Sequence, residues 1–203
     1  MTGDAGGDSA EPASASAAEL ADPPADAGTD WTHLDTEVAW ENPYFSAGYD
    51  EYRQPDGERS RYYWIDPGDF VAVVAETDAG EVVLLEQYDA RLGRSLLTCP
   101  GGAVEDGESF VDAGLRELRE ETGFRAGEAE LLEAYQPTAW TRMTQAVVYA
   151  TDLEAGAADR EGGEDIDAFT VPAEEAVAAL RSRDLPFGGG LVAVLVASDE
   201  GLL

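Results

Sequence analysis

The chain has 203 residues, of which 44% are hydrophobic, enough for one globular domain with a packed core and some additional segments. It carries 43 acidic against 12 basic residues, a formal net charge of −31, and every basic residue is an arginine. This balance argues against nucleic acid as a partner, because binding to its phosphates needs a cationic face.

Cys99 is the only cysteine and His33 the only histidine. An intrachain disulfide is therefore impossible, and a histidine-based triad or a zinc site is disfavoured. We expect Cys99, at the end of an apolar run, to be a buried small hydrophobic residue. No apolar run reaches the length of a membrane span, and the N-terminus lacks the features of a secretion signal, so we expect a cytoplasmic protein without membrane contact.

The N-terminal third divides into two parts. Residues 1–30 hold seven acids but no aromatic residue and no arginine, so we expect a mobile acidic tail. Residues 31–65 are rich in aromatic side chains and contain the turn sequence QPDG at 54–57, which predicts one or two short strands in a small sheet. We expect this N-terminal β subdomain to precede a second domain over residues 66–203.

The next elements are strands. Residues 70–75 and 82–88 are apolar runs separated by residues 77–80, which favours a hairpin. Residues 94–99 predict a further strand that leads into the loop of Pro100, Gly101 and Gly102.

A helix should follow this loop. Ser109 and Asp112 form a helix-start signal, and Gly123 ends the helix. Apolar residues and a threonine between these points recur at helical spacing, as a narrow stripe that can pack on a sheet: Val111, Leu115, Leu118 and Thr122.

Three glutamates of this helix lie away from the stripe. Glu117, Glu120 and Glu121 should converge on one exposed patch, which is unfavourable unless a cation sits there. Converging carboxylates suit Mg²⁺ or Mn²⁺, which would keep several waters and take further ligands from substrate phosphate. Arg116 can hold Glu120 in place, and a peptide carbonyl of the glycine loop can ligate the metal.

The remainder alternates strands and helices. Residues 131–135, 144–151 and 166–171 predict strands, with a Gly-rich acidic loop at 152–165. Pro172 can open a helix that runs to about Arg183, whereas residues 191–197 are ambiguous between helix and strand. These elements predict an α/β/α sandwich around a mixed β-sheet, with the small N-terminal antiparallel sheet added.

Residues 102–124 read GAVEDGESFVDAGLRELREETGF. Their glycines, Glu108, the Arg-Glu and Glu-Glu pairs and the aliphatic residue stand at the intervals of the Nudix box, and the chain resembles the Nudix hydrolases. An acid-rich composition explains the number of carboxylates, but not the other residues at the required intervals. The resemblance implies the same sandwich fold and the hydrolysis of nucleoside diphosphates linked to another moiety.

Three shorter stretches are similar to the ADP-ribose and nucleotide-sugar pyrophosphatase branch: ENPYF at 41–45 with the later PDG, EQY at 86–88, and EDI at 164–166. This resemblance implies Mg²⁺ bound by the metal glutamates, the Gly101 carbonyl and the diphosphate. It also implies that Glu164 orients or deprotonates the attacking water, with Glu161 and Asp165 as competitors for that role. It further implies a homodimer built through the N-terminal sheet.

Two departures affect the substrate contacts. In that branch an arginine follows the Gln-Tyr pair, but here Asp89 does, and the segment before Gly102 also differs. Arg91 and Arg94 are therefore our candidates for contact with the diphosphate. Aromatic residues that could stack on the base are Trp40, Tyr44 and Trp140, and the sequence favours none of them.

The leading hypothesis is a Mg²⁺-dependent pyrophosphatase for ADP-ribose or a related nucleotide sugar. One alternative is a Nudix hydrolase for a dinucleotide or a nucleoside triphosphate, although the aromatic N-terminal extension disfavours a minimal triphosphate-cleaving domain. Another is a non-catalytic, nucleotide-sugar-binding regulator. Against this last alternative, every metal-binding glutamate of the box is present.

The acids are spread over the whole chain, as in proteins adapted to molar salt, whereas a module that docks on a basic partner would carry them in one run.

We predict that lowering KCl from about 2 M to about 0.1 M lowers the midpoint of thermal unfolding, because repulsion between carboxylates is then less screened. Circular dichroism measures the midpoint, with sucrose at matched osmolality as the control. An unchanged midpoint would contradict this expectation.

Overall fold

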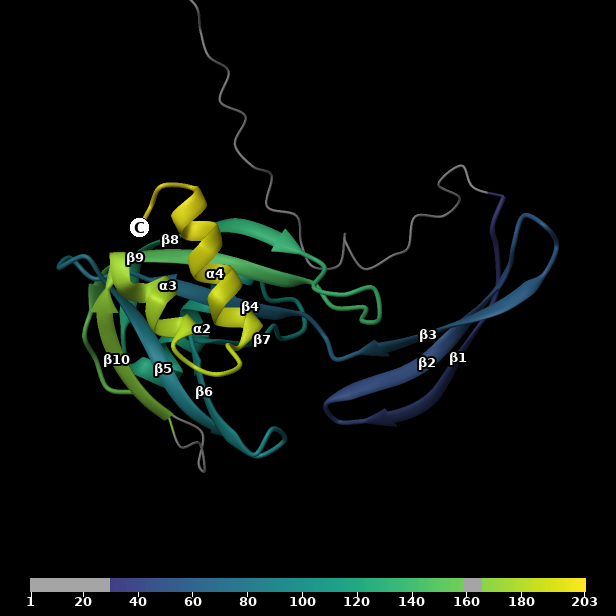
Figure 1. Cartoon of the computed structure of the whole chain (residues 1–203), viewed down its shortest axis with the longest axis horizontal. Helices are drawn as coiled ribbons and strands as arrows, with labels where there is room; N and C mark the ends of the chain where they lie inside the picture. The colour runs from purple at the N-terminus through teal and green to yellow at the C-terminus, as the bar shows by residue number, and fades with distance from the viewer. Residues whose placement is uncertain (1–29, 159–165) are drawn as a thin grey trace, which may run out of the picture.

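The computed structural model describes residues 30–158 and 166–203. Within these ranges the chain forms three sheets and three helices (Figure 1). None of these helices is long and apolar enough to cross a membrane. Both the expected acidic tail up to residue 29 and the expected catalytic loop with Glu161, Glu164 and Asp165 lie outside the described residues.

The N-terminal sheet has three antiparallel strands, β1 (Thr32–Asn42), β2 (Phe45–Arg53) and β3 (Arg59–Asp66), in that order. Figure 1 shows this sheet reaching out from the rest of the molecule. The predicted turn is confirmed, since the N–H of Gly57 donates to the carbonyl of Gln54 at 2.9 Å. The expectation of one or two short strands was wrong, since the sheet has three strands of 11, 9 and 8 residues. Cross-strand aromatic pairs favour such long paired strands, as with Tyr52 and Tyr62, whose ring centroids lie 5.8 Å apart.

This sheet is joined to the body at β3. The N–H of Ile65 donates to the carbonyl of Trp140, and the N–H of Arg142 donates back to the carbonyl of Ile65. The Arg142 guanidinium also lies 3.9 Å from the centre of the Trp64 ring and pairs with Asp50. Although burial alone would raise it, the hydrogen bond from Arg142 holds the pKa of Asp50 below its ordinary value.

Two further sheets form the body. One is mixed, with the order β7-β4-β9-β8, and its β4 and β9 run parallel. The other is antiparallel, with the order β10-β5-β6. Their bounds are β4 (Phe70–Ala75), β5 (Glu81–Asp89), β6 (Arg94–Thr98), β7 (Gly101–Ala103), β8 (Arg125–Tyr135), β9 (Gln145–Glu154) and β10 (Ile166–Pro172).

The expected hairpin of β4 and β5 was wrong, although the turn between them forms. The N–H of Gly80 donates to the carbonyl of Thr77, and one bridge joins Glu76 to Val82. Beyond it the strands diverge, because β7 and β9 already occupy both edges of β4. As a result β5 pairs with β10 and β6 instead, and the chain changes sheets at this turn.

Helices cover the sheets on two sides (Figure 1). Val71, Val73 and Ala75 of β4 pack in the cluster that contains α2 (Phe110–Thr122). The alternate residues Ala72 and Val74 pack in a second cluster, which contains α3 (Ala173–Arg181) and α4 (Gly188–Asp199). Because β4 is buried on both faces, its sequence is a continuous apolar run. The expected α/β/α sandwich is confirmed, and the ambiguous segment 191–197 is helical.

Helix α2 begins and ends as predicted. The Ser109 hydroxyl accepts from the N–H of Asp112, and Gly123 adopts a left-handed conformation with φ of 83°. The buried face differs from the predicted stripe, since only Leu118 of that stripe is fully buried. The other buried residues of the helix are Phe110, Ala113, Gly114 and Glu121. A side chain at Gly114 would lie 3.1 Å from Val73, so this glycine lets the helix approach β4 closely.

Candidate active site

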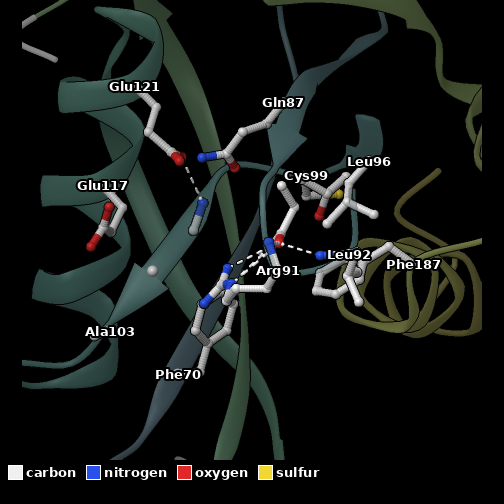
Figure 2. Close-up of a pocket in the computed structure, with 14 residues that line it drawn as sticks. Phe70, Gln87, Arg91, Leu92, Leu96, Cys99, Ala103, Glu117, Glu121 and Phe187 are labelled. Carbon is white, nitrogen blue, oxygen red and sulfur yellow. Dashed lines mark hydrogen bonds and ion pairs between the residues drawn. The ribbon is translucent and has the colours of Figure 1, made fainter. Parts of the chain in front are cut away.

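A cleft of about 590 Å³ lies between α2, the β6–β7 loop, the β5–β6 hairpin and the start of α4 (Figure 2). Part of its wall is polar and includes carboxylates, a guanidinium and an amide. The rest is apolar or bare backbone. The lining residues are Phe70, Gln87, Asp89, Arg91, Leu92, Leu96, Thr98, Cys99, Gly101, Gly102, Ala103, Glu117, Glu121 and Phe187.

Glu121 is the buried carboxylate of this cleft. The residue is only 8% exposed, so the expectation of an exposed patch was wrong for Glu121. The backbone N–H of Gly101 donates to its Oε2 at 2.8 Å, the contact drawn in Figure 2. A charge-assisted bond of this kind offsets part of the desolvation that burial imposes on a carboxylate.

The two glycines that open β7, Gly101 and Gly102, have no room for side chains. A Cβ on Gly101 would lie 2.1 Å from the carbonyl oxygen of Val71, and its φ of 155° is one that other residues rarely adopt. On Gly102 a Cβ would lie 2.2 Å from Oε1 of Glu117. The bare backbone therefore lets β7 pack closely against β4 on one side. On the other side it leaves room for the Glu117 side chain.

Arg116 organises the carboxylates around the start of α2. Its Nε and Nη2 donate to Glu108 at 3.1 and 3.0 Å, and its Nη1 donates to Glu117 at 2.8 Å and to Glu120 at 3.4 Å. Nη2 also donates to the carbonyl of Ala103. The guanidinium holds the pKa of Glu108 below its ordinary value through these hydrogen bonds. The predicted contact between Arg116 and Glu120 is confirmed.

Glu120 lies apart from the cleft lining. Its carboxylate accepts from Arg119 at 2.9 Å as well as from Arg116, and it is more exposed than Glu117. The structure therefore brings Glu117 and Glu121 to the cleft and leaves Glu120 at its side.

The donor set fits a hard divalent cation. Within residues 30–158 and 166–203, no three His, Cys, Asp or Glu side chains form a ready cage for a metal ion. Magnesium does not need such a cage, because it usually keeps several waters and binds through one or two carboxylates together with substrate phosphates. Glu117, Glu121 and the backbone of Gly101 line the same cleft and offer oxygen ligands of this kind.

Arg91 lines the cleft, as expected for a contact with the diphosphate, whereas Arg94 does not. Arg94 donates to the carbonyl of Leu185 at 2.7 Å and so ties the start of β6 to the segment before α4. Arg91 is paired with Asp89, and its hydrogen bonds lower the pKa of Asp89 to about 2.

The aromatic residues considered for stacking on the base, Trp40, Tyr44 and Trp140, are all exposed and absent from the cleft lining. Its aromatic side chains are instead Phe70 and Phe187. Sequence reasoning missed Phe187, whose position before the glycines that open α4 was the available signal.

Two residues on the far wall complete the cleft. Cys99 is buried as predicted, and burial raises the pKa of its thiol to about 12, so it serves as an apolar wall residue. Gln87, in the centre of the predicted EQY stretch, projects from β5 into the cleft (Figure 2).

Comparison with known proteins supports this picture. The NUDIX domain family matches residues 66–188. The chain is 31% identical over 134 residues to the ADP-ribose pyrophosphatase of Bacillus subtilis (strain 168), covering 64% of this chain and 72% of that protein. It is 31% identical over 102 residues to the methanol dehydrogenase activator of Bacillus methanolicus, covering 50% of this chain and 55% of that protein.

A solved structure of an ADP compounds hydrolase has the same fold. It superposes with a TM-score of 0.74 at 21% identity, covering 85% of this chain and 97% of that one.

We predict that Arg116→Lys lowers the free energy of unfolding by about 1–3 kcal/mol, because a lysine cannot reproduce the fork to Glu108 while also reaching Glu117 and Ala103. Urea denaturation in molar KCl measures the change. Arg119→Lys is the matched control on the same helix, since among the described residues the Arg119 side chain donates to Glu120 alone. Equal stability of the two variants would show that the Arg116 cluster is not a stabilising one.

Proposed function

The chain belongs to the NUDIX domain family, and we propose that it hydrolyses the pyrophosphate bond of ADP-ribose or a related nucleotide sugar in a Mg²⁺-dependent reaction. The products would be a nucleoside monophosphate and a sugar phosphate. The observation that carries the proposal is one cleft in which two carboxylates of α2, a bare glycine loop and a guanidinium meet.

The parts of this cleft match the parts of the substrate. Glu117, Glu121 and the carbonyl of Gly101 would hold the cation, with Glu120 beside them as a further ligand when the metal is bound. A bound divalent cation would neutralise charge on the phosphoryl group and lower the pKa of a bound water. Arg91 supplies a cationic group of this chain itself for the diphosphate oxygens.

Arg116 acts on the geometry of the metal ligands. Its guanidinium holds Glu117 and Glu120 through separate hydrogen bonds from the same face of α2. The two carboxylates are thereby fixed before a cation binds, and less side-chain ordering remains to oppose binding.

The apolar part of the cleft suits the rest of the substrate. Phe70, Leu92 and Phe187 line it together with the polar groups, so a ring of the substrate can be buried beside its diphosphate. This supports a nucleoside diphosphate derivative as the ligand class.

We further propose that the protein works as a homodimer through β1–β3. This sheet and its β1–β2 turn expose six large apolar side chains, and exposed apolar patches mark interaction surfaces in other proteins. They are Val38, Trp40, Tyr44, Tyr62, Tyr63 and Ile65. Sedimentation velocity in molar KCl decides between a dimer and a monomer.

One observation favours a second candidate function. The Bacillus methanolicus relative is an activator of another enzyme, so a regulatory role remains the alternative to nucleotide-sugar hydrolysis. Hydrolysis of a different nucleoside diphosphate derivative, such as a dinucleotide or a triphosphate, would keep the chemistry and change only the substrate.

We predict that, in molar KCl with Mg²⁺, the protein converts ADP-ribose to AMP and ribose 5-phosphate. Other nucleotide sugars, dinucleotides and nucleoside triphosphates are offered in parallel, and chromatography identifies the products. Glu121→Gln should lower turnover by about 100-fold or more, because glutamine can still accept from Gly101 but is a poor metal ligand.

Glu130→Gln is the matched control, since it makes the same charge change on β8 outside the cleft lining. Equal turnover in the two variants would show that Glu121 is not a metal ligand. Binding of ADP-ribose without any cleavage would favour the regulatory alternative.

We propose Glu164 as the residue that orients or deprotonates the attacking water. Glu164→Gln should lower kcat by about 100-fold or more, as expected for loss of a general base. Glu161→Gln and Asp165→Asn are the comparison variants from the same acidic stretch. A larger loss in either of them would move the role to that residue.

A further inference from the structure

We propose that Asp89 is a positioning residue, which fixes the guanidinium of Arg91 for contact with the diphosphate of the substrate. This inference rests on the proposed function, because the diphosphate is the group that Arg91 would bind. It concerns the residue that directly follows the Gln-Tyr pair at the end of β5.

Asp89 holds Arg91 through both of its carboxylate oxygens. Its Oδ2 accepts from Nη2 of Arg91 at 2.6 Å and from Nε at 3.2 Å, and its Oδ1 accepts from Nε at 3.2 Å (Figure 2). These bonds occupy one edge of the planar guanidinium. A guanidinium carries five N–H donors, so the edge with Nη1 keeps its donors for a ligand.

The same carboxylate also fixes the turn that carries Arg91. Its Oδ1 accepts from the backbone N–H of Arg91 at 2.8 Å and from that of Leu92 at 3.1 Å. The backbone carbonyl of Asp89 accepts from Gly93 at 2.8 Å. One side chain thus sets both the turn and the guanidinium mounted on it.

The burial of the two partners differs in the way that a positioning role requires. The Asp89 side chain is 9% exposed, whereas the Arg91 side chain is 90% exposed. An arginine this exposed can adopt many rotamers in water. If Asp89 holds it in one of them, less side-chain conformational entropy is lost when a ligand binds. The Asp89 carboxylate, largely covered where it contacts Arg91, acts as the fixed support, and the exposed guanidinium is the part that a ligand can reach.

The charges explain why the pair must be kept together. A carboxylate in the cleft would repel a diphosphate if it stood alone, and Arg91 neutralises it. Removing Arg91 would therefore both delete a donor and expose a repulsive charge. Removing the charge of Asp89 would loosen the guanidinium, and the loss of its own repulsion for the diphosphate would offset part of that effect.

Two contacts outside the cleft hold the hairpin that carries the pair. Arg94 donates to the carbonyl of Leu185, and Arg183 pairs with Glu86 at 2.8 Å. Both join the β5–β6 hairpin to the segment between α3 and α4. These contacts brace the hairpin against the segment before α4, so Asp89 has a fixed base from which to orient Arg91.

The test is a double-mutant cycle of Asp89→Asn and Arg91→Gln. Asparagine keeps an oxygen for the two backbone N–H groups, so the turn is retained while the bidentate hold on Arg91 is lost. We expect Arg91→Gln to raise the KM for ADP-ribose about tenfold or more and Asp89→Asn to raise it about threefold to tenfold, with kcat little changed. The double variant should be no worse than Arg91→Gln alone, because without Arg91 there is no guanidinium for Asp89 to position, and the repulsive charge is removed as well.

Controls with the same charge changes lie outside the cleft. Asp78→Asn alters the turn between β4 and β5, and Arg181→Gln alters the end of α3, and neither should change KM. Thermal unfolding of Asp89→Asn should match that of the unaltered protein. The proposal would be overturned if the KM increases of the two single variants multiplied in the double variant, or if Asp89→Asn left KM unchanged.

Equilibrium binding of ADP in the presence of Mg²⁺ separates this inference from the proposed function. Suppose that ADP-ribose is not cleaved, that Asp89→Asn and Arg91→Gln each weaken ADP binding, and that the double variant binds ADP no more weakly than Arg91→Gln alone. The positioning role then stands and the proposed reaction fails. If ADP-ribose is cleaved and Asp89→Asn changes neither KM nor ADP binding, the positioning role fails and the reaction stands. Failure of the unaltered protein to bind ADP would overturn the positioning role.

Discussion

The site depends on one close approach, in which the bare backbone of strand β7 packs against both strand β4 and helix α2. The N–H of Gly101 donates to the buried carboxylate of Glu121, while the same glycine packs against the carbonyl of Val71. A carboxylate can be buried here only because a donor is presented to it. This contact joins the glycines of β7 to the face of α2 that carries Glu121.

Charge is the second constraint on this molecule. With a net charge of −31, few cations are available inside the chain, and the structure places arginines where several carboxylates meet. Arg116 serves Glu108, Glu117 and Glu120 together, and Arg91 neutralises Asp89 at the cleft. The planar guanidinium makes this possible because it donates in several directions at once, which a lysine ammonium does not do with fixed geometry.

The features that sequence reasoning predicted are local ones. The cap at Ser109, the end of α2 at Gly123 and the contact of Arg116 with Glu120 follow from spacings of three or four residues. The features it missed depend on long-range pairing: β4 and β5 enter different sheets because β9, far along the chain, takes an edge of β4. The burial of Glu121 and the position of Phe187 likewise depend on segments that meet only in the fold, and no periodicity encodes them.

The central claim is that Glu121 and Glu117 hold the divalent cation over the glycine loop. Anomalous diffraction from crystals grown with Mn²⁺ and AMP tests it most directly, because the metal is located without reference to activity. We expect a metal peak at coordination distance, about 2.1 Å for Mg²⁺ and close to that for Mn²⁺, from both carboxylates and the carbonyl of Gly101. Metal found only at other surface carboxylates, with this part of the cleft free of it, would contradict the account.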